Sequence, residues 1–401
     1  MALLPVEEAL SIILSDVGTL PVEELPIAEA AWRVLGEDLR AQRTQPPFDV
    51  SAMDGYAVRA VDIATTPISL SVIGESAAGN GFSGTLGPNE AVRIFTGAPV
   101  PKGADTVVIQ EDTSRSRTNV EILETIALGR HIRRAGLDFS IGDIVLNAGR
   151  TLDPAAISLA ASANYATLPV IRRPRVAILA TGDELALPGS RLGPDQIVSS
   201  NSYGVAAVID EAGGITIDLG IVGDRIDDIR GAVERAVELE ADILVTLGGA
   251  SVGDHDLVQA ALKQRGIALD FWKLALRPGK PMMFGLLDEM RVLGLPGNPV
   301  SSLICSHIFL APLVKALGGR SYKPDKRRVR LGQPMRQNDL RRDYVRATVS
   351  YDASGDAIAT PFTLQDSSML STLANADGLI IRDPFAPAAN EGDLVDVLML
   401  R

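Results

Sequence analysis

The pattern of apolar residues changes several times along the chain. Over residues 3–40 apolar positions recur every three to four residues, first from Val6 to Leu14 and again across 27–35, which predicts helices. From about residue 50 to residue 150 the pattern becomes short β-branched runs separated by Gly, Pro, Asn and Asp, which predicts a small β domain.

After this β stretch the pattern returns to helix over residues 154–165. Asp153 is suited to cap that helix, and Pro154 fits its first turn. We therefore expect the N-terminal helices and this segment to form one helical unit, which the β domain interrupts.

Strands alternate with helices over residues 174–317, which predicts a mostly parallel sheet covered by helices. A long apolar helix should run from Pro299 to about Gly318, with Asn298 as its N-cap. Strand-like runs over 320–401 predict a terminal β domain. In the alternating region the expected strands are 175–180, 216–222, 242–247, 281–287 and 291–295, and the expected helices are 202–211, 227–240 and 257–264.

These patterns predict a multidomain α/β plus β fold. A central doubly wound, mostly parallel α/β domain is joined by a helical N-terminal unit, an inserted β domain and a C-terminal β-barrel-like domain. The predicted boundaries are 1–45 with 147–172 for the helical part, 46–146 for the inserted β domain, 173–320 for the α/β domain and 321–401 for the C-terminal domain.

Composition narrows the classes of function. The 401 residues are too many for one core, and the net charge of −12 argues against a general nucleic-acid binder, because phosphate backbones are held by basic surfaces. The single Cys305 excludes an intrachain disulfide framework, and its apolar neighbours indicate a buried helix face. The sequence has no signal-peptide pattern and no stretch judged long and apolar enough to span a bilayer, so we expect a cytoplasmic protein without a membrane partner.

A glycine-rich loop follows the predicted strand 242–247. Glycines let the backbone approach an anion, and the helix that follows would point its free amides at that anion. Two acids in this loop, Asp254 and Asp256, would repel a phosphate unless a metal ion lay between the acids and the phosphate. A simple glycine turn in which one of these acids caps the helix explains the loop equally well.

The other strand ends of the α/β region also carry charges. Because the carboxyl ends of parallel strands meet at one edge of a sheet, we expect these side chains to converge. The acids could hold a hard cation such as Mg²⁺, and the bases could bind phosphate. The residues concerned are the acids Glu184, Asp224 and Asp256 and the bases Lys273, Arg277 and Lys280.

Six motifs occur in order along the chain: SAMDGYA at 51–57, TGAP at 96–99, TGDEL at 181–185, GGASVG at 248–253, RPGKP at 277–281 and LPGNPVS at 295–301. With these motifs the chain resembles the molybdopterin molybdenumtransferase family, which includes the E domain of gephyrin, over essentially its whole length. The resemblance implies a four-domain, elongated homodimer. It also implies an enzyme that uses Mg²⁺ to insert molybdate into adenylylated molybdopterin, releasing AMP and molybdenum cofactor.

The resemblance assigns roles residue by residue. Glu184, Asp224 and Asp256 match the metal-binding and catalytic acids of the family. Asp54 and Thr96 match catalytic positions on the inserted β domain, which in the family faces the α/β domain of the other subunit, so the site would be shared between two subunits. The residues implied in substrate binding are Gly248, Gly249, Ser251, Gly253, Lys273, Arg277, Lys280, Pro296, Asn298, Ser301, Arg133 and Asp138.

Three positions depart from the family pattern. Val50 stands where Asn is expected, Leu137 where Glu is usual, and Arg277 where Lys is common. The arginine keeps a cation, whereas the valine and the leucine remove polar groups from their neighbourhoods.

Two other functions are compatible with parts of the sequence. An adenylyltransferase that loads AMP onto molybdopterin resembles the α/β region, but it would not need Asp54 or the inserted β domain. A non-catalytic dimeric scaffold that binds molybdopterin would not need the full set of acids. The resemblance also implies contacts with other cofactor-biosynthesis proteins and with apo-molybdoenzymes.

Overall fold

The computed structural model describes residues 3–248 and 257–401. The chain forms two compact units, Met1–Glu23 with Ile171–Arg401, and Glu24–Val170. Each unit has hydrophobic cores of its own. The finer division into four domains remains a prediction.

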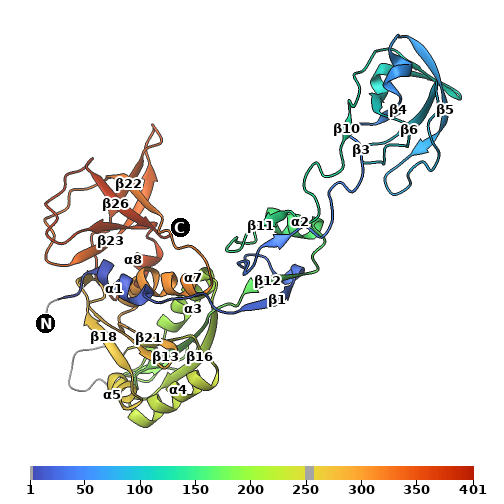
Figure 1. Ribbon diagram of the computed structural model, residues 1–401. Helices are drawn as coiled ribbons and strands as arrows, with labels where there is room; N and C mark the ends of the chain where they lie inside the picture. The colour runs from blue at the N-terminus through green and yellow to red at the C-terminus, as the bar shows by residue number, and fades with distance from the viewer. Residues whose placement is uncertain (1–2, 249–256) are drawn as a thin grey trace. The chain divides into compact units, whose positions relative to one another are not determined.

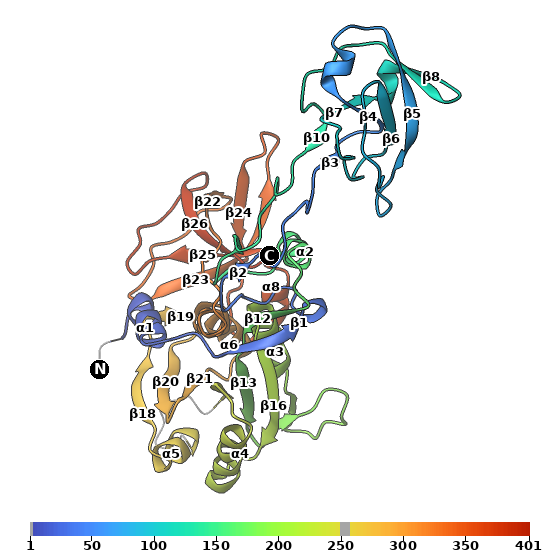
Figure 2. The same cartoon turned by 45° about the vertical axis from the view of Figure 1, so that its right-hand side comes forward.

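A six-stranded sheet in the order β16-β13-β17-β21-β20-β18 is the centre of the first unit. The first four of these strands are mutually parallel, and β20 is antiparallel to β21 and to β18, as the neighbouring strands in Figure 2 illustrate. The strand runs expected from the sequence are thus confirmed. The bounds are β13 Arg175–Thr181, β16 Ile215–Val222, β17 Ile243–Leu247, β18 Ala268–Lys273, β20 Pro281–Leu287 and β21 Met290–Leu295.

Helices cover both faces of this sheet, which is why β13 and β17 are buried along almost their whole length. One core contains α1 (Val6–Leu14), α3 (Asn201–Ala212), α6 (Pro299–Cys305) and α7 (Ala311–Leu317). The opposite core contains α4 (Ile226–Glu238) and α5 (Leu257–Gln264). A π-helical turn over Ser306–Leu310 joins α6 to α7, so the long helix predicted from Pro299 is confirmed with an irregular centre.

This long helix corrects one expectation from the sequence. Pro299–Leu317 is long and apolar enough to cross a membrane, but 78% of its most apolar window is buried inside the protein. The apolar composition therefore reflects a core helix packed against the central sheet.

The N-terminal segment is only partly helical. Helix α1 forms as expected, but the helix predicted over 27–35 is wrong, because only Ile27–Glu29 makes a 3₁₀ turn. Val34 and Leu35 instead form isolated β-bridges, to Thr151 and Val170. The single helical unit is also wrong, since α1 and α2 (Pro154–Ser162) lie in different compact units. The apolar face of α1 is buried in the core that also contains α7.

The C-terminal strands form a closed barrel, confirming the barrel-like fold. The order β19-β23-β24-β22-β26-β25 closes through an additional pairing of β23 with β25, and β22, β23 and β26 lie together in Figure 1. One strand, β19, comes from the loop after β18 and pairs with β23. The bounds are β19 Leu276–Arg277, β22 Lys326–Leu331, β23 Arg342–Tyr351, β24 Ala357–Pro361, α8 Leu370–Ala374, β25 Gly378–Arg382 and β26 Leu394–Met399.

The second unit contains a curled sheet in the order β7-β4-β6-β5-β9-β8. Helix α2 begins as the sequence predicts, with Pro154 at its first turn and the Asp153 carboxylate accepting a hydrogen bond from the Ala156 amide at 2.8 Å. The bounds are β4 Gly55–Val58, β5 Ile68–Ser76, β6 Glu90–Ile94, β7 Thr106–Ile109, β8 Thr113–Ser116 and β9 Asn119–Ile122. Short pairs join β1 (Val22–Pro26) to β12 (Thr167–Ile171), β2 (Leu39–Arg40) to β11 (Ile144–Leu146) and β3 (Val50–Ser51) to β10 (Ile132–Arg133).

The packing of α1 can be tested at Ile13, whose side chain is fully buried. Ile13→Ala should lower the free energy of unfolding of the first unit by about 2 to 5 kcal/mol, because it leaves a cavity in a close-packed core. Urea denaturation followed by tryptophan fluorescence and circular dichroism measures this loss. Ser11→Ala, an exposed change on the same helix, is the control, and an equal effect of the two variants would contradict the packing.

Candidate functional site

A cavity of about 700 Å³ opens where β13, β17 and β21 end. The segment after β24 in the barrel completes its wall with Ser368 and Leu370. The cavity thus lies at the strand ends where the sequence placed a binding site. It brings together five of the predicted residues, namely Glu184, Gly248, Pro296, Asn298 and Ser301.

Gly248 has a position that requires glycine. Its φ is +93°, and a Cβ atom there would lie 3.2 Å from the carbonyl oxygen of Thr181. Its amide donates a hydrogen bond to the carbonyl of Leu295 at 3.3 Å. The glycine therefore keeps the ends of β13, β17 and β21 close together at the cavity wall.

The described part of the predicted acidic cluster lies at two neighbouring strand ends. Glu184 follows β13 and lines the cavity, whereas Asp224 follows β16, is exposed and does not line it. The Asp224 amide donates a hydrogen bond to the Asp183 carboxylate at 3.2 Å, which joins the two loops.

No group of three or more His, Cys, Asp or Glu side chains suited to a metal occurs within residues 3–248 and 257–401. The third predicted acid, Asp256, lies outside those residues, so the metal site remains a prediction. Three of the predicted substrate-binding residues, Gly249, Ser251 and Gly253, also lie outside the described residues.

The predicted cations take different positions. Lys273 is half-buried and Lys280 is exposed, and neither lines the cavity. Arg277 lies in β19, where it pairs in register with Asp343 of the barrel. Its guanidinium binds Asp339 at 3.0 Å and also Asp343, and the hydrogen bond to Asp343 raises the pKa of Arg277. A phosphate at Arg277 would therefore compete with two carboxylates for the guanidinium.

Asn298 is at the N-cap position of α6, but its side chain does not cap the helix. Its Nδ2 atom instead hydrogen-bonds the hydroxyl of Ser367 at 2.9 Å, which links the cavity loop to the barrel. Asn201 donates a hydrogen bond to the carbonyl of Gly297 at 2.7 Å and also lines the cavity. Our sequence reasoning missed this residue, although a Ser-Ser-Asn run before a helix is a typical polar helix start.

In the second unit, two predicted catalytic residues are in direct contact. The amide and the hydroxyl of Thr96 both donate to Asp54 Oδ1, at 2.7 and 2.9 Å. These hydrogen bonds, the amide first, hold the pKa of Asp54 below its usual range. The next residue along the chain has to be a glycine. Strands β4 and β7 approach so closely at Gly55 that a Cβ atom there would lie 1.9 Å from the Val108 carbonyl oxygen.

A cation beside this pair was not predicted. The Arg93 guanidinium lies over the Tyr56 and Phe95 rings, 5.1 and 4.9 Å from their centroids, and its charge also lowers the pKa of Asp54. An arginine flanked by aromatic residues on neighbouring strands was the signal available in the sequence.

The other predicted residues of the second unit are exposed. Arg133 pairs in register with Val50, and the Asp138 amide donates to the carbonyl of Gln45 at 3.0 Å. Their neighbour Arg134 forms an ion pair with Asp49 at 2.5 Å, so this polar loop is held in place by residues that the sequence analysis did not assign.

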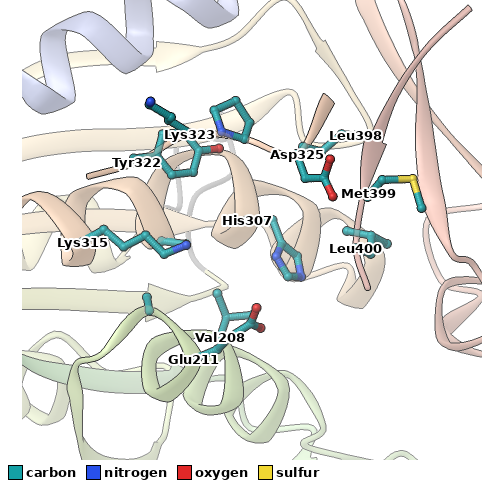
Figure 3. A pocket seen from close by; sticks show the side chains of 13 residues that line it. Val208, Glu211, His307, Lys315, Tyr322, Lys323, Asp325, Leu398, Met399 and Leu400 are labelled. Carbon is teal, nitrogen blue, oxygen red and sulfur yellow. The ribbon is translucent and has the colours of Figure 1, made fainter. Parts of the chain in front are cut away.

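A second cavity of about 180 Å³ contains none of the predicted site residues. Figure 3 shows the His307 ring with Glu211 of α3 on one side and Asp325 on the other, while the Lys315 amine lies 5.7 Å from the Tyr322 ring centroid. Cys305, two residues before His307, is fully buried, and burial raises the pKa of its thiol to about 12. Cys305 therefore belongs to the core, as predicted, and is not a nucleophile.

His307 should make stability depend on pH. Burial lowers its pKa from 6.5, with Lys315 acting in the same direction and Glu211 opposing. Below pH 6.5 the unfolded chain therefore binds a proton at His307 that the folded chain does not. As the pH decreases, the free energy of unfolding decreases too, until the pH reaches the pKa of His307 in the folded protein.

His307→Asn should reduce this loss between pH 7.5 and pH 5.5. Urea denaturation of both proteins across that range measures it, and parallel stability curves would contradict the assignment. Because the pKa of His131 is also lowered, His131→Asn is the comparison variant.

Comparison with known proteins covers almost the whole chain. Residues 4–164 match the MoeA N-terminal region (domain I and II), residues 177–316 match a probable molybdopterin binding domain, and residues 328–400 match the MoeA C-terminal region (domain IV). The fold is similar to that of the molybdopterin biosynthesis MoeA protein from Pyrococcus horikosii, with a TM-score of 0.86, 31% identity and coverage of 100% of both chains.

Curated relatives agree. A molybdopterin molybdenumtransferase from Haemophilus influenzae is 34% identical and aligns with 94% of this chain and 93% of its own length. One from Bacillus subtilis is also 34% identical, covering 99% of this chain and 94% of the relative. The chain therefore belongs to the molybdopterin molybdenumtransferase family.

Proposed function

We propose that this chain is a transferase of molybdenum cofactor biosynthesis. It would insert molybdenum from molybdate into adenylylated molybdopterin and release AMP and molybdenum cofactor. The observation that carries the proposal is the cavity at the ends of β13, β17 and β21. It lies in the region that matches a molybdopterin binding domain, and five residues predicted for this chemistry line it.

The substrates set an electrostatic problem. Molybdate and a phosphoanhydride are both anions, and the chain itself has a net charge of −12, so local cations are needed to bring them together. Lys273 and Lys280 flank the loop between β18 and β20 and would supply that charge. Asn298 and Ser301 would orient the ligand in the cavity through hydrogen bonds.

Carboxylates at the strand ends are suited to Mg²⁺, which prefers oxygen ligands. Glu184 and Asp224, with Asp256 from outside the described residues, would hold the ion. When bound, Mg²⁺ would supply Lewis acidity at the phosphoanhydride. In this proposal the three acids act as metal ligands and not as general bases.

The second half of the site would come from another copy of the chain. In the second unit the Asp54 carboxylate accepts hydrogen bonds from Thr96, which hold its pKa below the usual range, and the Arg93 cation lies beside it. We infer a homodimer in which the Asp54–Thr96 pair faces the α/β rim of the other subunit. The protein would work in the cytoplasm and transfer its product to apo-molybdoenzymes.

The decisive measurement is AMP release from adenylylated molybdopterin, with and without molybdate and with Mg²⁺ or a chelator. Release that depends on both molybdate and Mg²⁺ supports the proposal. Adenylylation of molybdopterin from ATP would instead identify an adenylyltransferase. Molybdopterin binding without turnover would identify a scaffold.

Glu184→Gln should reduce AMP release by about a hundredfold or more, because it removes one metal-binding charge at the cavity. Its melting temperature should stay close to that of the wild type, since Glu184 lies at the cavity surface and not in the core. Glu238→Gln, an exposed acid on α4, is the control and should retain full activity. Normal turnover by Glu184→Gln would remove this residue from the site.

A shared site predicts complementation between inactive variants. Asp54→Ala and Glu184→Gln should each be inactive alone. Refolded as a one-to-one mixture, they should regain about a quarter of wild-type activity, because half of the dimers are mixed and each mixed dimer holds one intact site. Absence of recovery in a mixture shown to exchange subunits would place Asp54 and Glu184 in the same subunit's site.

A further inference from the structure

The largest fully buried side chain in the described part of the molecule belongs to an arginine, Arg346 of β23, which is only 1% exposed. Its guanidinium hydrogen-bonds an amide and backbone carbonyls instead of a carboxylate. Burial lowers the pKa of Arg346, although Asp366 and Asp343 oppose the shift. A charge buried with neutral partners is costly, so packing alone does not account for an arginine at this position.

The contacts of Arg346 converge on one turn of the barrel, Gln365–Met369. The Gln365 side-chain oxygen accepts from the amide and from Nε of Arg346, both at 3.0 Å, and its Nε2 donates back to the Arg346 carbonyl at 3.0 Å. Nη1 of Arg346 donates to the carbonyls of Asp366 at 2.9 Å and Met369 at 3.5 Å. The arginine therefore holds both ends of the turn.

The turn is also closed within itself. Oδ1 of Asp366 accepts hydrogen bonds from the amide and the hydroxyl of Ser368, at 2.8 and 2.6 Å. These bonds lower the pKa of Asp366, and the charge of Arg346 lowers it further. The turn is thus a rigid piece attached to a buried cation.

The opposite side of this turn contacts the candidate site. The Val300 amide donates to the Ser367 carbonyl at 3.1 Å, and the Asn298 side chain hydrogen-bonds the Ser367 hydroxyl at 2.9 Å. Ser368 itself lines the cavity. A path of hydrogen bonds therefore runs from Arg346 through the turn to the loop at the end of β21.

We propose that Arg346 is a positioning residue of the candidate site. It sets the place of the Gln365–Met369 turn, and through Ser367 it sets the orientation of Asn298 at the cavity wall. This inference rests on the proposed function for its effect on turnover, but its effect on the turn and on the Asn298 loop is independent of that function.

Arg382 provides a matched control. It is also a buried arginine of the barrel, 7% exposed, and its Nη2 also donates to backbone carbonyls, those of Arg336 and Pro387. None of these partners belongs to the turn. Arg346→Leu and Arg382→Leu should therefore destabilise the barrel similarly, and only the first should loosen the cavity wall.

The experiment combines hydrogen–deuterium exchange with kinetics on the full-length protein. Arg346→Leu should speed amide exchange in peptides covering 365–370 and 296–301 and raise the KM for adenylylated molybdopterin about tenfold, because misplaced binding groups weaken ligand binding. Arg346→Lys keeps the positive charge, so its KM should lie between those of the wild type and Arg346→Leu. Gln365→Ala, an exposed change that removes the contacts from the other side, should reproduce the effect if Arg346→Leu fails to fold.

The outcomes separate this inference from the proposed function. Unchanged exchange over 296–301 in Arg346→Leu, or in Gln365→Ala if that variant replaces it, overturns the positioning role, whatever the activity. Equal changes over 296–301 in Arg382→Leu overturn it as well, since they would reflect general loosening. If the wild type releases no AMP, the proposed function fails, and the exchange data alone decide the role of Arg346.

Discussion

The parallel pairing of β13, β16, β17 and β21 is the constraint on which the candidate site depends. Parallel strands must all end at the same edge, so four loops distant in sequence are brought together there. Gly248 shows how tight this junction is, because its φ of +93° is one that other residues rarely adopt and a Cβ atom there would lie 3.2 Å from the carbonyl oxygen of Thr181. The cavity forms at this edge of the sheet, and the barrel segment that contains Ser368 completes its wall.

The barrel is therefore more than an appended domain. Strand β19, which lies in the loop after β18, pairs with β23 of the barrel. The Arg277 guanidinium in β19 is therefore bound by two carboxylates of the barrel. The barrel also places Ser367 against Asn298. Both contacts tie loops of the α/β region to the barrel and its separate core, so the two parts of this unit restrain each other's loops.

The second unit presents a simpler feature. Its curled sheet positions Asp54 beside the Thr96 amide and hydroxyl, and two aromatic rings hold Arg93 nearby. The hydrogen bonds from Thr96 hold the pKa of Asp54 below its usual range.

The sequence by itself determined the strand and helix order of the α/β region except for the edge strand β18, together with the barrel-like C-terminus and the family, because periodicity and short motifs are local properties. It also found five residues of the cavity wall, since strand ends can be read without coordinates. It failed for 27–35, where Val34 and Leu35 are buried by β-bridges to distant residues.

Only the tertiary structure decided that Asn298 contacts Ser367 and that Arg277 binds barrel carboxylates. It alone also decided that Arg346 is buried against the Gln365–Met369 turn. These partners are separated by about 20 to 70 residues in the chain, and long-range packing, to which no local pattern is sensitive, brings them together.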